Sequence, residues 1–168
     1  MPQFGPKPRF WHKIIQLIAA SRFGSWLLAD NLYRLDRPLL QMTGGRTTLT
    51  SILSGLPVVV LTAKGAKSGE PRTLPIAAMK DGSRLVLIAS AFGKPRHPSW
   101  YHNLKANPKA EVQINGTNYS CRAYEAEGEE RSRYWDRAVK MYAGFARYAQ
   151  QAKPRRIPVM VLEVEGLT

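Results

Sequence analysis

Two turn-forming dipeptides, Asp81-Gly82 and Asn115-Gly116, constrain the fold of this chain more than any other feature of its sequence. Asp-Gly and Asn-Gly favour the two-residue turn of a β-hairpin, because that turn needs residues that tolerate positive φ. Each dipeptide lies between two β-prone runs, and the four runs cover residues 72–80, 84–90, 110–114 and 117–124. Consecutive antiparallel hairpins predict a β-meander or a barrel.

Further strands and helices are expected around these hairpins. They are strands over 58–61 and 157–164, a short helix over 98–106, and a longer helix that follows the acidic cluster 125–130 and carries Trp135, Tyr142 and Phe145. Valine-rich runs favour strands, and Pro158 suits the first residue or an edge of one. Acidic side chains before a helix stabilise the positive end of its dipole. The fold class is therefore α+β.

The N-terminal segment differs from the rest. Three prolines with basic neighbours over 2–9 predict a mobile basic tail. Trp11, Ile14, Ile15 and Ile18 then follow at helical spacing, which predicts an amphipathic helix. A glycine-containing loop over 41–56 joins it to the main domain. We expect a basic tail and amphipathic helical segment at 1–40 and a β-barrel domain at 41–168.

Composition narrows the class of protein. At 168 residues, with 44% hydrophobic and 22% charged residues, the chain fits one ordinary globular domain. The net charge is +13, and the basic excess lies in the first two thirds, which suits a polyanionic partner. The single cysteine, Cys121, and three histidines make a poor metal-ligand set, so no metal site is expected.

The segment TAKGAKSGEPR, residues 62–72, has the chemistry of an anion site. Gly65 and Gly69 let the backbone turn its N–H groups toward an anion, and Lys67 and Ser68 add a charge and a hydroxyl. The spacing differs from a Walker phosphate loop. The segment is therefore either a phosphate-binding loop or a solvated basic hairpin loop.

A second segment, residues 89–108, combines small and aromatic side chains. Small residues end a predicted strand before Lys94 and Arg96, and this leaves room for a flat ring. Trp100 and Tyr101 follow in the predicted helix, and single aromatic side chains of this kind more often belong to a core or an interface than to a cofactor site. His97 and His102 are five residues apart, which does not suit a metal site on one helical face.

Together with Leu74, Pro75, Asn103 and the pair Met141-Tyr142, these two segments resemble the deazaflavin-dependent nitroreductase and quinone reductase family. The resemblance extends over about residues 58–164. It implies a flavin-reductase-like split β-barrel and the coenzyme F420, an 8-hydroxy-5-deazaflavin. It also implies an oxidoreductase that transfers a hydride from reduced F420 to quinones, enones or nitroaromatics.

The same resemblance implies a cofactor site. The residues expected beside the phosphate and the polyglutamate tail are Ala66, Lys67, Ser68, Arg72 and Thr73. Those expected beside the ring are Pro75, Ile76 and Ala77 with Ile88, Ala89, Ser90 and Ala91, and the pocket is closed by Ser99, Trp100, Tyr101, His102 and Asn103. A tailed anionic coenzyme would account for the basic residues clustered in this part of the chain.

The resemblance also implies substrate and proton-transfer residues. Ser90 near the ring and Tyr142 and Tyr148 of the longer helix are the candidate proton donors, and Tyr142 and Phe145 are the candidate substrate-binding residues. The two tyrosines equally fit simple helix packing. Two positions depart from the family: Ala66 stands where many relatives have Arg, and Phe145 where a relative has Tyr. Loss of the arginine removes a bidentate phosphate partner, for which neighbouring Lys64 compensates as a point charge. The Phe145 departure bears on the substrate range.

Other classes of protein would share some of these sequence features. A split barrel that binds flavin mononucleotide or haem would share the basic loop, and a non-catalytic deazaflavin carrier would share the site. A nucleic-acid-binding protein would spread its aromatic residues along a basic face. Here those residues lie mostly in predicted helices, so nucleic acid is not an expected partner.

The location in the cell is a further expectation. No run approaches the roughly 20 apolar residues of a spanning helix, which predicts a cytoplasmic protein. The apolar and basic residues over 10–28 suit peripheral contact with an anionic membrane, where a lipid quinone would be found. The same stripe would also fit a helix packed on the barrel.

Overall fold

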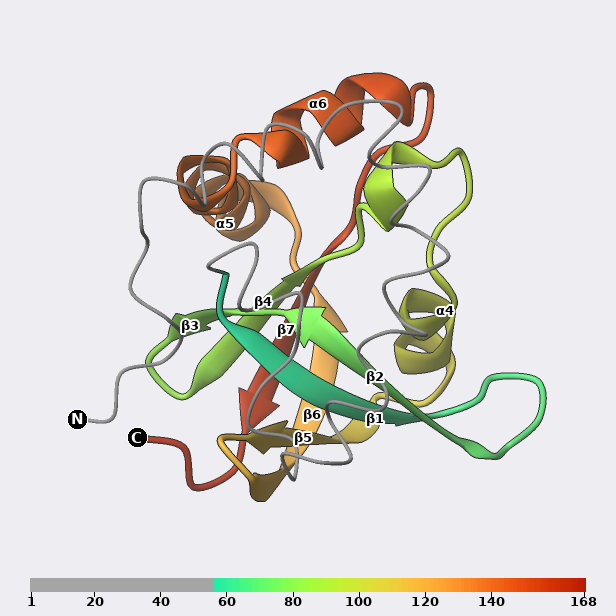
Figure 1. Cartoon of the computed structure of the whole chain (residues 1–168), viewed down its shortest axis with the longest axis vertical. Coiled ribbons are helices and arrows are strands. Elements are labelled where there is room, and N and C mark those ends of the chain that lie inside the picture. The colour runs from blue at the N-terminus through green and yellow to red at the C-terminus, as the bar shows by residue number, and fades with distance from the viewer. Residues whose placement is uncertain (1–55) are drawn as a thin grey trace.

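A computed structural model describes residues 56–168, in which one curled antiparallel sheet carries helices on its outside (Figure 1). The strands are β1 Val58–Lys64, β2 Pro71–Ala77, β3 Met79–Asp81, β4 Arg84–Ile88, β5 Lys109–Ile114, β6 Thr117–Glu125 and β7 Val159–Val164. The helices are the short 3-10 segment η1 Ala91–Gly93, then α4 Ser99–Ala106, α5 Gly128–Met141 and α6 Gly144–Gln151. The α+β expectation is confirmed.

The order of the strands explains the curl. Hydrogen bonds join them in the order β2-β1-β5-β6-β7-β4-β3, so β2 and β3 lie at opposite edges. Only Ala78 separates these two strands in the sequence, and it is fully buried. Because one residue joins the two edges, the sheet must curl until they meet. The result is the split β-barrel that the family resemblance implies.

Both predicted hairpins are present. Ile114 pairs with Thr117, and the two residues between them, Asn115 and Gly116, have φ of 50° and 86°. In the β3–β4 hairpin Asp81 pairs with Arg84, so the two-residue turn is one position later than the Asp-Gly dipeptide. Each turn contains a glycine at positive φ, the conformation for which glycine is favoured.

The single strand predicted over 72–80 is wrong, because the segment forms two strands. β2 pairs with β1, whereas β3 pairs with β4 at the opposite edge of the sheet. The hydrophobic pattern continues through the junction, since Ala78 and Met79 are both buried. Local pattern alone therefore did not reveal that the chain changes partner here.

The structure confirms one of the two helices predicted for this part of the chain and divides the other. α4 confirms the predicted short helix, and Pro98 is its N-cap. The single long helix predicted after the acidic cluster is wrong, because it divides into α5 and α6 at Tyr142, which has extended dihedrals of −147° and 102°. A Cβ at Gly144 would overlap the Tyr142 ring, so the break turns this ring back over the start of α6.

The core has two parts, one on each side of the sheet. The first fills the barrel with residues such as Leu61, Leu87 and Leu162, together with Trp100 and Leu104 of α4. The second lies between the sheet and the α5–α6 pair, which Figure 1 shows across one end of the barrel. This second part contains Tyr134, Tyr142 and Tyr148, so the tyrosines of α5 and α6 are interior residues.

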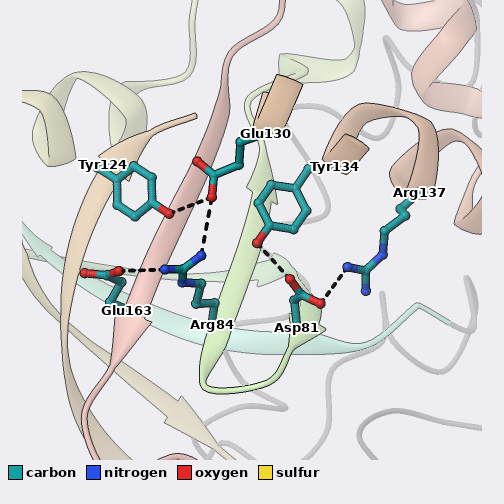
Figure 2. A network of polar contacts seen from close by, with 7 residues as sticks. All are labelled: Asp81, Arg84, Tyr124, Glu130, Tyr134, Arg137 and Glu163. Atoms are coloured by element: carbon teal, nitrogen blue, oxygen red, sulfur yellow. Dashed lines mark hydrogen bonds and ion pairs between the residues drawn. The ribbon is translucent and has the colours of Figure 1, made fainter. Parts of the chain in front are cut away.

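Polar contacts attach α5 to the strands beneath it (Figure 2). Tyr134 donates a hydrogen bond to Asp81 at 2.8 Å, and Arg137 forms an ion pair with the same carboxylate at 2.7 Å. A second group links Glu130 of α5 to Arg84 at 3.4 Å and to Tyr124 at 3.0 Å. The Asp81-Gly82 hairpin is therefore fixed to α5 as well as to its neighbouring strand.

Some expectations concern parts of the chain outside the described residues. The basic tail, the amphipathic helix, the membrane-contact segment 10–28 and the boundary at residue 40 all precede residue 56. Within residues 56–168, no helix is long and apolar enough to span a membrane. The same residues contain no cluster of three metal-ligating side chains.

Candidate functional site

The β1–β2 loop is a compact structure built on its own backbone. Gly65 N–H donates to the Glu70 carbonyl at 2.8 Å, and Gly69 N–H donates to the Gly65 carbonyl at 2.9 Å. A Cβ at Gly65 would lie 2.6 Å from Ser68 Oγ, and Gly69 has φ of 72°. Both glycines are therefore required by the shape of the loop. Figure 1 shows this loop extending from the barrel beside α4.

Ser68 of this loop and Arg72 at the start of β2 carry groups that can bind an anion. Ser68 Oγ accepts hydrogen bonds from Glu70 N–H at 3.3 Å and from Arg72 Nη2 at 3.4 Å. With both lone pairs used, the hydroxyl can still donate its proton outward. Lys67 and Arg72 are exposed beside it. A hydroxyl donor with two cations suits the phosphodiester of a tailed coenzyme, so the donor set fits F420.

Helix α4 is attached to this loop by buried and partly buried amides. Asn103 Oδ1 accepts the Ala66 N–H at 3.0 Å, and Asn107 Nδ2 donates to the Lys64 carbonyl at 3.4 Å. Asn103 is 9% exposed, so the amide that accepts the Ala66 N–H is buried. The structure thus brings together two predicted site residues, Ala66 and Asn103, that lie 37 positions apart in the sequence.

The other residues predicted to close the pocket have different surroundings. Trp100 is 8% exposed and packs in the barrel core, which agrees with the structural alternative considered for it. Tyr101 donates to Glu125 at 3.0 Å, and burial together with this carboxylate raises the pKa of Tyr101. His102 is exposed, and Ser99 is exposed at the first turn of α4. Thr73 contacts Thr62 across β1 and β2, with hydroxyl oxygens 2.9 Å apart.

The two segments predicted to flank the ring lie on strands that touch. Pro75, Ile76 and Ala77 belong to β2, residue 88 ends β4, and β2 contacts β4 where the barrel closes. Ala89 is completely buried, whereas Ser90 and Ala91 are half-buried. Closure of the sheet therefore brings the strand that carries the first segment into contact with the strand at whose end the second segment begins.

The segment after β4 has an unusual backbone. Ala91, Phe92 and Gly93 have φ of 48°, 53° and 77°, so three consecutive residues are left-handed. For residues other than glycine this conformation costs about 1–2 kcal/mol each. Gly93 also has no room for a side chain, because a Cβ there would lie 2.5 Å from Gln151 Oε1 of α6. Contacts from elsewhere must stabilise this turn.

Arg155 provides those contacts, and the sequence reading missed it. Its guanidinium donates to the carbonyls of Ser90 at 2.8 Å, Lys94 at 2.9 and 3.1 Å, and Ala89 at 3.2 Å. Arg155 Nη1 also lies 3.1 Å from His97 Nδ1. Burial, Arg155 and His102 lower the pKa of His97, which favours a neutral ring that accepts from Arg155. In the sequence, only the general basic character of 153–156 marked this region.

Two of the three candidate proton donors, Tyr142 and Tyr148, form a buried pair. The hydroxyl oxygens of Tyr142 and Tyr148 lie 3.0 Å apart, and Phe145 packs edge-on against both rings. Burial raises the pKa of both tyrosines, so both are protonated near neutral pH. Phe92 packs against Tyr148, with ring centroids 5.9 Å apart, which connects the pair to the turn after β4. Phe145 is 6% exposed.

The fold and the site together define a flavin-reductase-like split barrel, and comparisons identify its family. The family model of the F420H(2)-dependent quinone reductases matches residues 32–164. An F420H(2)-dependent quinone reductase of Mycobacterium tuberculosis is 33% identical over 133 residues, which cover 78% of this chain and 89% of that protein. The chain belongs to the F420H(2)-dependent quinone reductase family. It is an oxidoreductase, and its cofactor is coenzyme F420.

Solved structures agree with this assignment. An F420-H2-dependent reductase is 41% identical with a TM-score of 0.59, and the match covers 64% of this chain and 94% of that one. A solved domain-swapped dimer is 36% identical with a TM-score of 0.60, and that match covers 76% and 96% of the two chains. The family resemblance in the two segments is thereby confirmed, as is the split-barrel fold.

Proposed function

We propose that this reductase passes a hydride from reduced F420 to a quinone, an enone or a nitroaromatic compound bound beside the coenzyme ring. The family name supports a quinone-type acceptor. The observation that carries the proposal is the contact between Ala66 N–H and Asn103 Oδ1, since it joins the cation-bearing loop to α4. Bound F420 supplies the hydride from its C5 position, and the protein binds, orients and excludes water.

The β1–β2 loop binds the phosphodiester and the acidic tail in this proposal. Ser68 donates its hydroxyl proton, Lys67 supplies a point charge, and Arg72 keeps most of its five donors available beyond its contact with Ser68. Ala66 offers no side-chain donor, and its N–H is committed to Asn103. The nearby Lys64 supplies the charge that an arginine at position 66 would have brought.

The ring lies where β2 meets the end of β4, and small residues there include Ala77, Ala89 and Ser90. Pro75, Ile76 and Ala77 on one side and Ile88, Ala89, Ser90 and Ala91 on the other are its proposed neighbours, and residues 99–103 of α4 close the pocket. Small side chains admit a flat ring without displacement of the barrel core. The acceptor then lies toward Phe145 and Tyr142, on the α6 side of the turn.

Proton delivery falls to Ser90, Tyr142 or Tyr148. The raised pKa values of the tyrosines keep both hydroxyls protonated, so each can donate a hydrogen bond to a developing oxyanion. Tyr142 is 7% exposed and Tyr148 only 2%. Tyr142 is therefore the proposed direct donor to the acceptor, and Tyr148 is its hydrogen-bond partner. Tyr142→Phe should lower kcat more than it raises KM for menadione.

Binding and turnover of F420 test the proposal. Oxidised F420 is titrated by fluorescence into the full chain and into Lys67→Ala and Arg72→Ala, and oxidation of reduced F420 is followed with menadione. Loss of a charge-assisted contact should raise Kd about tenfold in each variant. Lys140→Ala, an exposed cation on α5, is the matched control and should bind as the wild type does.

Other outcomes separate the alternatives. Unchanged Kd in both loop variants would refute the assignment of the loop. Tight binding with no oxidation of the reduced coenzyme by quinone, enone or nitro acceptors would refute the proposed classes of acceptor. Peripheral membrane contact through residues 10–28 remains a separate proposal, tested by vesicle pelleting with and without the N-terminal segment.

A further inference from the structure

The left-handed turn after β4 is flanked in the sequence by backbone carbonyls that all accept hydrogen bonds from the Arg155 side chain. Ser90 precedes the turn and Lys94 follows it, and the carbonyls of both accept hydrogen bonds from Arg155. The carbonyl of Ala89, the residue before Ser90, accepts a third hydrogen bond from the same guanidinium. Arg155 therefore bridges the two ends of the Ala91–Gly93 turn.

A planar guanidinium suits this task. Its donors lie in a fixed fork, so three carbonyls and one ring nitrogen can be satisfied by one side chain in one orientation. His97 supplies the ring nitrogen, and it also packs against Tyr101 of α4 with ring centroids 4.8 Å apart. The contacts of Arg155 thus extend from the end of β4 to the first turn of α4.

The carbonyl contacts also orient peptide groups. In a trans peptide the carbonyl and the following N–H lie on opposite sides. When the Ser90 carbonyl faces Arg155, the Ala91 N–H points away from it. Arg155 thereby fixes the direction in which the backbone N–H groups of this segment point. It also fixes the space between the segment and β2.

We propose that Arg155 is a positioning residue, which fixes the Ala89–His97 segment in the shape that binds the deazaflavin ring. The inference rests on the proposed function, because that function assigns Ile88–Ala91 to one side of the ring. Arg155 itself need not touch the coenzyme or the acceptor. Its role is to keep a strained turn in one conformation. Without the guanidinium contacts, the segment would be flexible and would leave that conformation.

Three variants of the full chain test this role. Arg155→Ala removes all the contacts, Arg155→Lys retains the charge without the fork, and Arg156→Ala removes the adjacent exposed cation as a control. We expect Arg155→Ala to raise Kd for oxidised F420 about tenfold or more, with Arg155→Lys intermediate and Arg156→Ala within about twofold of wild type. Added guanidinium at low millimolar concentration should partly restore binding to Arg155→Ala alone.

Hydrogen exchange separates this proposal from the function on which it rests. Amides of residues 89–97 should exchange faster in Arg155→Ala, while those of β7 should be unchanged. Wild-type protein that fails to bind F420 would refute the proposed function, and the exchange result would still judge the turn. Equal Kd and equal exchange in Arg155→Ala and wild type would overturn the positioning role, as would an equal loss in Arg156→Ala. If Arg155→Ala does not fold, Arg155→Lys with wild-type affinity would overturn it.

Discussion

Gly144 shows how one residue can decide the course of two helices. Its missing side chain leaves space for the Tyr142 ring, which turns back where α5 ends and α6 begins. In that position the Tyr142 hydroxyl lies 3.0 Å from that of Tyr148. The proposed proton donors therefore depend on a residue that has no chemistry of its own.

Gly144→Ala should destabilise the protein, although helix propensity favours the change. Alanine is better than glycine in a helix by about 1 kcal/mol, whereas overlap with a packed ring costs about 1–3 kcal/mol. Urea unfolding should show a lower midpoint for Gly144→Ala. In a Tyr142→Ala background the overlap is absent, so the same change should be neutral or stabilising. A destabilisation of the same size in both backgrounds would contradict this explanation.

At the scale of elements, the Asp81 contacts in Figure 2 join the β3–β4 hairpin to α5. The hydrogen bond from Arg137 and then that from Tyr134 lower the pKa of Asp81 from its usual 3.8. A carboxyl with a lowered folded pKa adds stability above its ordinary value and loses it as the pH falls through the folded value. The attachment of α5 should therefore weaken only in acid.

Asp81→Asn should lower the free energy of unfolding at pH 7 by about 1 kcal/mol, because the neutral amide no longer pairs with Arg137 as an ion. Urea unfolding between neutral pH and pH 3 should show a smaller pH dependence than in wild type. Glu163→Gln is the control, since its pair with Arg84 is half exposed and should contribute less than about 0.5 kcal/mol. Identical pH profiles for wild type and Asp81→Asn would show that Asp81 does not attach α5.

At the scale of the whole molecule, the net charge and the fold both contribute to binding of the coenzyme. The chain carries a net charge of +13. The β1–β2 loop, which bears the exposed Lys67 and precedes the exposed Arg72 at the start of β2, extends from the barrel. An acidic tail would be attracted over a distance that salt can screen, whereas the ring would be bound by contact. Tail and ring should therefore respond differently to ionic strength.

Raising NaCl from about 0.1 M to about 1 M shortens the screening length from about 10 Å to about 3 Å. We expect Kd for F420 to rise about tenfold or more over this range. A deazaflavin that lacks the phosphate and the tail should change by less than about twofold. Fluorescence titration measures both, and an equal response of the two ligands would contradict an electrostatic role for the loop.

The sequence by itself determined the features that depend on neighbouring residues. Asn115-Gly116 specified its hairpin because the turn dihedrals are a local property, and the glycine-bordered Lys67-Ser68 loop carried the family resemblance. Only the tertiary structure decided the partner change at Ala78, the break at Tyr142 and the contacts of Arg155. Arg155 meets carbonyls that lie 61 to 66 positions earlier in the chain. Such contacts exist only after β4 has paired with β7, which brings Ile88 opposite Val159, so no local pattern encodes them.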